Sequence, residues 1–110
     1  MTQTITTKAP EGLLRMATGR YLDTGSVAAY EFDDLGFKPR YVKVINLAAS
    51  SSSFEWVEGM ADASAWKTAV DGTAAIVTTN GITVGARGFT LGLDTDVNVA
   101  SEQISWIALG

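Results

Sequence analysis

The residues whose types and spacing could do chemistry in this chain lie near its C-terminal end, in the stretch GLDTDVN. Asp94, Asp96 and Asn98 alternate there as Asp-x-Asp-x-Asn, the order in which many calcium-binding loops begin. A calcium ion takes about six to eight oxygen ligands, and the EF-hand loop has Gly at its sixth position and Glu at its twelfth. Counted from Asp94, these positions hold Val99 and Ser105. We therefore predict no metal site and interpret the stretch as a polar loop between strands, in which Asp and Asn bond to the backbone. The candidate ligands, should a cation bind, are Asp94, Asp96 and Asn98.

Two pairs of carboxylates are the next candidates. Glu55 with Glu58, and Asp33 with Asp34, could in principle act as acid and base on a sugar. Glu55 falls in a predicted strand and Asp33-Asp34 in a predicted loop, so solvated surface charge explains both pairs. Histidine, the usual general base near neutral pH, is absent, and so is cysteine. Because no nucleophile and base are paired in the sequence, we predict that the chain is not an enzyme and uses no cofactor.

The aromatic residues are a third candidate, because exposed rings can stack on sugars. Trp56 and Trp106 alternate with polar residues in predicted strands and are expected in the core, where each ring buries a large apolar area. Trp66, between Ala65 and Lys67, is the tryptophan least expected to be buried. A carbohydrate-binding face that includes Trp66 therefore stays open as an alternative.

The charge of the chain and the length of its apolar runs argue against two classes of partner, nucleic acids and membranes. The net charge is −4, and the eight Lys and Arg residues are scattered along the sequence. DNA and RNA require clustered cations that displace counterions, so we predict no nucleic-acid binding. No apolar run approaches the ~20 residues of a membrane span, and we predict no contact with a membrane. The first ten residues, MTQTITTKAP, lack the basic and apolar regions of a signal peptide.

Short strands are the elements that must position these residues. The apolar segments are brief, turn residues separate them, and no long window sustains a helical period. We predict a single all-β domain over residues 11–110, an antiparallel β-sandwich or jelly roll, preceded by a flexible extended arm over residues 1–10. The segment 40–47 is apolar on both faces and should be a central strand. Further strands are expected at 26–32, 54–58, 66–70, 88–93 and 101–109.

The strongest local signal is the stretch AAIVTTNGITVG. Asn80-Gly81 suits the two central positions of a type I′ turn, which require positive φ. The alternation on either side would pair Thr79 with Ile82 and Val77 with Val84. We therefore predict a tight hairpin that reverses the chain at Asn80-Gly81.

The N-terminal arm is rich in threonine and has no core of its own. Its extended-prone residues could add as a strand to the sheet edge of a neighbouring copy, a common way to join subunits. The candidate contact residues of the arm are Thr2, Thr4, Ile5, Thr6 and Thr7.

Several stretches together resemble small virion structural proteins of tailed bacteriophages. These stretches are GFKPRYVKVIN from Gly36, FEWVEGM from Phe54, GIT, RGFTLG from Arg87 and the closing WIALG. The resemblance implies an all-β protein without catalytic residues that assembles symmetrically on the particle. It implies a capsid decoration or cement protein, made in the cytoplasm of the bacterial host and located on the capsid surface. The alternative is a receptor- or carbohydrate-binding module of a tail fibre or head fibre.

The expected partners follow from that resemblance. They are the major capsid protein and further copies of the chain, in a trimer or another symmetric oligomer. The candidate contact residues outside the arm are Trp66, Arg40 and Arg87. Either arginine could meet the acidic loop at Asp94 of a neighbouring copy.

Overall fold

The chain forms eight strands and no helix within the part that the computed structural model describes, residues 15–22, 28–48 and 51–110. The predicted arm over residues 1–10, with Thr2, Thr4, Ile5, Thr6 and Thr7, lies outside the described residues. Residues 15–22, 28–48 and 51–110 hold no helix of the length and apolarity needed to cross a bilayer. The strands are β1 (Met16–Tyr21), β2 (Tyr30–Phe32), β3 (Tyr41–Asn46), β4 (Ser53–Val57), β5 (Ser64–Thr68), β6 (Ala74–Gly85), β7 (Gly88–Leu91) and β8 (Ile104–Leu109).

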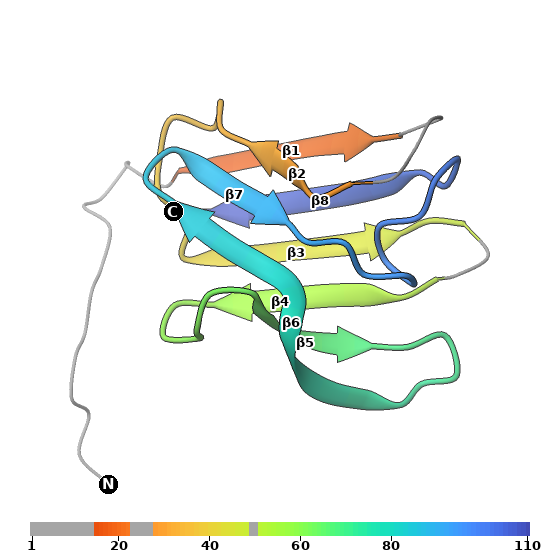
Figure 1. Cartoon of the computed structure of the whole chain (residues 1–110). Coiled ribbons are helices and arrows are strands. Elements are labelled where there is room, and N and C mark those ends of the chain that lie inside the picture. Colours follow the sequence, from red (N-terminus) through yellow and green to blue (C-terminus); the bar gives the residue numbers. More distant parts are fainter. Residues whose placement is uncertain (1–14, 23–27, 49–50) are drawn as a thin grey trace, which may run out of the picture.

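All eight strands belong to one antiparallel sheet in the order β1-β8-β3-β4-β5-β6-β7-β2. The prediction of an all-β antiparallel fold is confirmed. The strands do not divide into two separate sheets, as the strands of a sandwich do. Instead the single sheet curls strongly, like half a barrel, so that β7 and β2 lie across from β8 and β1 (Figure 1).

The long strand β6 produces the curl, and the predicted hairpin at Asn80-Gly81 is wrong. The first part of β6 pairs with β5, and its last part, from Ile82, pairs with β7. Asn80 does have a positive φ of 57°, but the chain bends there and continues. Ala65 pairs with Val77, whereas the preceding residue Ser64 pairs with Ile82. Residues 78–81 of β6 therefore have no partner in the ladder with β5. The chain reverses only after Gly85, so the NG signal marks a bulge that moves β6 from one side of the curl to the other.

The bend is possible because residue 81 has no side chain. A Cβ built on Gly81 would stand 2.6 Å from the carbonyl carbon and oxygen of Ser64. The Gly81 amide donates to the carbonyl of Ala63 at 3.0 Å, and its carbonyl accepts from the amide of Gly92 at 2.8 Å. Three segments of backbone therefore meet at this point. The local sequence is suited to a turn, but these tertiary hydrogen bonds make it a bend.

The predicted strands elsewhere agree with the structure in part, because the strand predicted at 66–70 is β5 at Ser64–Thr68, and those predicted at 26–32 and 101–109 begin at Tyr30 and Ile104. The strand at 40–47 is the central strand β3, paired with β8 on one side and β4 on the other. Phe54 and Trp56 point inward from β4, and Ile104, Trp106 and Ala108 point inward from β8. The predicted strand 88–93 is too long, because β7 ends at Leu91 and Leu93 is exposed.

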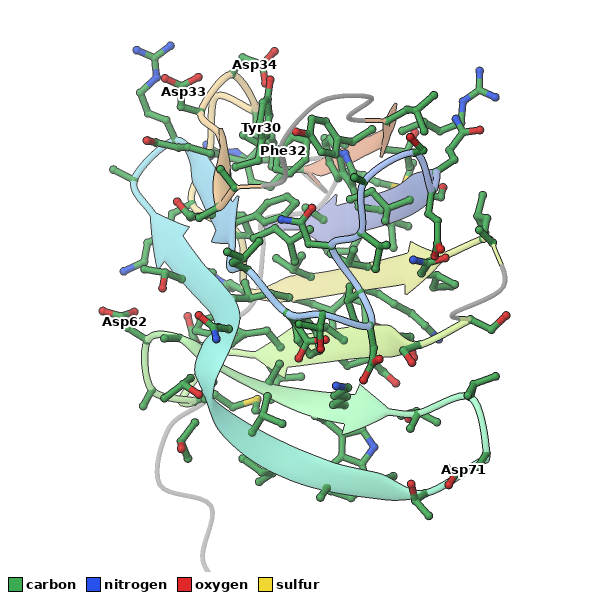
Figure 2. All side chains as sticks on the ribbon, turned by 45° about the vertical axis from the view of Figure 1, so that its right-hand side comes forward. Tyr30, Phe32, Asp33, Asp34, Asp62 and Asp71 are labelled. Atoms are coloured by element: carbon green, nitrogen blue, oxygen red, sulfur yellow. The ribbon has the colours of Figure 1, made fainter. Side chains whose placement is uncertain are left out.

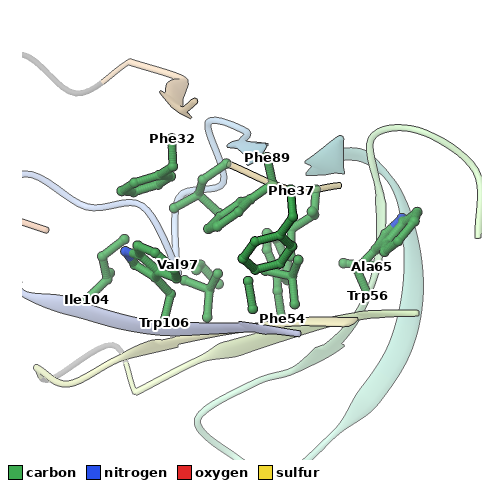
Figure 3. Close-up of a cluster of buried hydrophobic side chains, with 14 residues drawn as sticks. Phe32, Phe37, Phe54, Trp56, Ala65, Phe89, Val97, Ile104 and Trp106 are labelled. Atoms are coloured by element: carbon green, nitrogen blue, oxygen red, sulfur yellow. The ribbon is translucent and has the colours of Figure 1, made fainter. Parts of the chain in front are cut away.

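The core fills the concave side of the curl. Phe32 from β2 stacks on Phe89 from β7 with ring centroids 4.8 Å apart, and Trp106 lies 5.3 Å from each ring. Figure 3 shows these rings arriving from opposite walls of the curl. The expected order of tryptophan burial is confirmed, since Trp56 and Trp106 are 5% and 9% exposed and Trp66 is 43% exposed.

The two ends of the sheet approach each other without forming a ladder. The strands at these ends are β1 and β2, which stand last at either side of the strand order. Tyr21 of β1 and Tyr30 of β2 bring their ring centroids to 4.4 Å, and Phe32 lies 5.9 Å from Tyr21. Side chains therefore join these two edges, and we call the junction of β1 and β2 the seam.

Candidate functional site

The acidic stretch that begins at Asp94 belongs to the connection between β7 and β8, which crosses the open side of the curl (Figure 1). We call residues 92–103 the capping loop. Val97 of this loop is fully buried in the core, where it lies with Trp106 and Ile104 (Figure 3). The loop thus closes the concave side with an apolar side chain. The expectation of a loop between two strands is confirmed.

A lysine from β5 holds the acids of the capping loop. Lys67 Nζ donates to both carboxylate oxygens of Asp94 at 3.1 Å and to Asp96 Oδ2 at 2.8 Å. The Lys67 and Asp94 side chains are only 18% and 13% exposed, whereas that of Asp96 is 51% exposed. Asp94 Oδ1 also accepts from the amides of Asp96 and Val97 at 2.8 and 3.1 Å. The carboxylate of Asp94 therefore shapes the loop and anchors it to the sheet.

Two buried asparagines fix the rest of the capping loop. Asn46, at the end of β3, donates from Nδ2 to the carbonyl of Val97 at 3.3 Å and to Glu102 Oε1 at 3.0 Å. Asn98 donates from Nδ2 to the carbonyls of Ala28 and Gly92, at 2.9 and 3.2 Å. Buried amides that bond to backbone carbonyls hold a segment in one conformation. The loop is therefore a structural closure of the curl.

The three candidate cation ligands do not converge on one point. An ammonium group lies between Asp94 and Asp96, where a cation would have to bind, and the Asn98 side chain is directed at Ala28 and Gly92. The described residues contain no group of three or more metal-ligating side chains. In this arrangement Asp94 and Asp96 form ion pairs with Lys67.

Sequence reasoning missed Lys67, although a signal was present. Trp66 faces outward from β5, so its neighbours Ala65 and Lys67 must face inward, because successive side chains of a strand alternate. A lysine at an inward position needs a carboxylate partner, since an unpaired buried charge is costly. The carboxylate partner of Lys67 could have been sought in Asp94-Thr95-Asp96, where the acids after β5 are most closely spaced.

The environment of Lys67 stabilises its charged form. Burial lowers the pKa of this amine, but the hydrogen bonds to Asp96 and Asp94 outweigh that effect and raise the pKa above its ordinary value of 10.5. Because the pKa of Lys67 is higher in the folded state, the ion pair contributes fully to stability when the pH is below the pKa of the unfolded state. The contribution is lost as the pH rises through the higher pKa of the folded state.

We expect Lys67→Met to lower the free energy of unfolding by about 1–3 kcal/mol, the range for losing hydrogen bonds to charged groups. Methionine keeps the aliphatic stem but leaves Asp94 without its ammonium. Urea denaturation would measure the loss, and amide exchange at Asp96 and Val97 would report release of the capping loop.

The matched control for this change is Arg40→Met. Arg40 pairs with Glu58 at 3.7 Å, but both side chains are well exposed, so the cost should stay within about 1 kcal/mol.

The difference in stability between wild type and Lys67→Met should also shrink at pH values above about 10.5. Equal losses for the two variants, or a difference that persists in strong alkali, would contradict this role of Lys67.

The convex face of the sheet carries a second group of candidate residues. The ladder places Trp66 of β5 directly opposite Ile76 of β6, and both point outward with exposures of 43% and 61%. Val57, Ile45 and Met16 are exposed at other outward positions of β4, β3 and β1. We call Met16, Ile45, Val57, Trp66 and Ile76 the outer face. Of these five, Trp66 and Ile76 are direct cross-strand neighbours, and an exposed pair of large apolar side chains suits contact with another protein.

The other candidate residues come from different strands and loops. Arg40 lies beside Glu58, just before β3, while Arg87 is in the exposed turn between β6 and β7. Glu55 of β4 accepts a hydrogen bond from the Tyr41 hydroxyl at 3.0 Å, on the outward side. Asp33 and Asp34 follow β2 in a loop, far from Asp62 and Asp71, as Figure 2 shows. Of the predicted acids and arginines, Arg40 thus pairs with Glu58, and Asp33 and Arg87 line one cavity beside the turn between β6 and β7.

The class that these features define is an all-β protein built on one curled antiparallel sheet, closed by a capping loop and apolar on part of its convex side. Searches among protein-family models, curated proteins and solved structures give no match to this chain.

Proposed function

We propose that the chain is a non-enzymatic structural protein of a phage virion, and specifically a decoration or cement protein. It would bind the lattice of the major capsid protein and neighbouring copies of itself, and so stabilise the head. In this proposal the curled sheet takes the place of the sandwich predicted from the sequence, and residues 1–10 extend from it as a flexible arm.

The observation that carries the proposal is the outer face. Trp66 and Ile76 form an exposed cross-strand pair, and tryptophan is among the residues that dominate binding energy in protein interfaces. Exposed apolar residues on one side of a rigid sheet suit a surface that docks on a regular lattice. The resemblance of the stretches from Gly36 onward to phage virion proteins supports the same reading.

The edge of β1 supports a second contact. Among the described residues the ladder of β1 is the one with β8, which leaves β1 last in the strand order, and strand addition takes place at the end of a sheet. In the proposed assembly, residues 2–7 of one copy add to such an edge in the next copy. Repetition of this contact around a closed ring would give a trimer or another symmetric oligomer.

We expect deletion of residues 1–9 to weaken binding to the particle while the fold stays intact. The reason is that the arm would supply backbone hydrogen bonds to a neighbouring copy but none to its own core. Co-sedimentation of the purified chain with particles of the phage that encodes it would measure binding, and circular dichroism would check the fold. Full occupancy by the shortened chain would rule out the arm contact.

The location of the chain is tested directly by a cryo-EM map of the intact particle. The proposal predicts density for the curled sheet on the outside of the head, with the outer face against the major capsid protein. Density at the tail or at a fibre would overturn the assignment as a decoration protein. Absence of the chain from purified particles would overturn the virion assignment itself.

A further inference from the structure

The seam between β1 and β2 contains a cleft with features that packing alone does not explain. The cleft has a volume of about 260 Å³. This is slightly below the roughly 300–1,000 Å³ of typical small-molecule sites, so it suits a ligand of about one ring. Its lining residues come from three strands and the loop after β2. They include Arg20, Tyr21, Tyr30, Phe32, Asp33, Asp34 and Trp106.

A buried donor without a partner lies at this cleft. The indole nitrogen of Trp106 is the one buried side-chain nitrogen or oxygen among the described residues that has no hydrogen-bond partner. Trp106 is 9% exposed. Buried polar groups in native proteins are nearly always hydrogen-bonded, because leaving one unsatisfied costs about 1–3 kcal/mol. An orphaned N–H in a lined cleft therefore indicates an acceptor that a ligand supplies.

The nitrogen lies on the side of the indole that faces the seam. A Cβ built on Gly19 of β1 would stand 2.6 to 2.8 Å from Trp106 Cζ2, Cε2 and Nε1, so this edge of the ring lies over β1. Arg20 and Tyr21, the next residues of β1, form that wall of the cleft. In the described chain no ladder joins β1 to β2, so at the seam these two strands meet through side chains such as Tyr21 and Tyr30.

The groups around the cleft define what a ligand must offer. Tyr30 is 41% exposed and presents a ring for stacking. Asp33 and Asp34, which lie close to Tyr30 in Figure 2, are exposed carboxylates that accept hydrogen bonds. The ligand must therefore bring an apolar face for the tyrosine, donors for the acids and an acceptor for the indole N–H of Trp106.

We propose that the seam is a binding site for a neutral sugar ring. A pyranose meets all three requirements, because its C–H face stacks on an aromatic ring while its hydroxyl groups both donate and accept. An organic cation without oxygen, such as tetramethylammonium, would suit the tyrosines and the acids, but it offers no acceptor to Trp106. This site differs from the predicted carbohydrate face at Trp66, which lies on the convex side. The inference does not depend on the virion assignment.

The test uses the indole N–H signals of the full-length protein in ¹⁵N NMR spectra. The chain has three tryptophans, and Trp106→Phe identifies the signal of Trp106. The probes are glucose, galactose, mannose, rhamnose and N-acetylglucosamine, each titrated to about 10 mM to detect a Kd near 1 mM. We expect at least one sugar to move the Trp106 signal and to leave the Trp66 signal in place.

Two exposed-ring variants separate the seam from the outer face. Tyr30→Ala should weaken binding of that sugar by about tenfold, the loss of one ring contact, and Trp66→Ala should leave the Kd unchanged. Tyr30→Ala also keeps the test valid if Trp106→Phe fails to fold. The proposal is overturned if no sugar moves the Trp106 signal, if Trp66→Ala abolishes binding, or if tetramethylammonium binds in the cleft and the sugars do not.

Discussion

Replacing Gly81 by valine is expected to unfold the protein or to lower its free energy of unfolding by about 3 kcal/mol or more. The Cβ would lie 2.6 Å from backbone atoms of Ser64 and 2.8 Å from the carbonyl oxygen of Ala63. Backbone cannot yield as a side chain does, so the bend of β6 would have to open. The sheet would then lose the curl that brings β7 against β8. Urea denaturation followed by tryptophan fluorescence would measure the loss.

Gly85→Ala is the matched control within the same strand. A Cβ on Gly85 would meet its nearest atom, the carbonyl oxygen of Gly88, at 3.9 Å, an ordinary contact. We expect the free energy of unfolding to change by no more than about 1 kcal/mol. If both variants were equally stable, the close backbone approach at Gly81 would not be what holds the curl.

The second large effect is expected at the outer face. Trp66→Thr should weaken binding to the particle by about thirtyfold or more, the loss of about 2 kcal/mol that defines an interface hot spot. Threonine suits a strand, and residue 66 is already exposed, so the stability of the isolated chain should change by less than about 1 kcal/mol. Co-sedimentation with particles that lack the chain would give the affinity.

Val70→Thr is the control for this prediction. Val70 is 66% exposed, so it is an exposed apolar residue like Trp66. It lies after β5, however, and outside the outer face. Its replacement should leave the affinity for particles unchanged. The outer face would be excluded as the docking surface if Trp66→Thr bound as tightly as wild type.

The strands were predictable because their signal is local. Alternation of apolar and polar residues identified β4 and β8 and assigned Trp56 and Trp106 to the core, and an apolar run identified the central strand β3. The same local reasoning failed at Asn80-Gly81. There Asn80 has the positive φ that the turn requires but Gly81 does not, and backbone hydrogen bonds to Ala63 and Gly92 decided that the chain would bend. Those partners lie far along the chain and leave no trace in the turn sequence.

The candidate sites divide in the same way. Register within GLDTDVN was enough to argue against an EF-hand, since Val99 and Ser105 take the positions of Gly and Glu. The partner of the acids could not be read from that stretch, because Lys67 lies 27 residues before Asp94. The seam is equally non-local, since it exists only where the curl brings Tyr21 and Tyr30 together.

The sequence by itself determined that the chain is all-β, that Trp56 and Trp106 face inward, and that histidine and cysteine chemistry is absent, because composition and period-2 alternation are properties of neighbouring residues. Only the tertiary structure decided that one sheet curls on itself and that Lys67 holds Asp94 and Asp96. It also decided that Trp106 presents an unpaired donor at the seam. These features depend on contacts between distant segments, whose geometry is set by the twist and bending of the whole sheet.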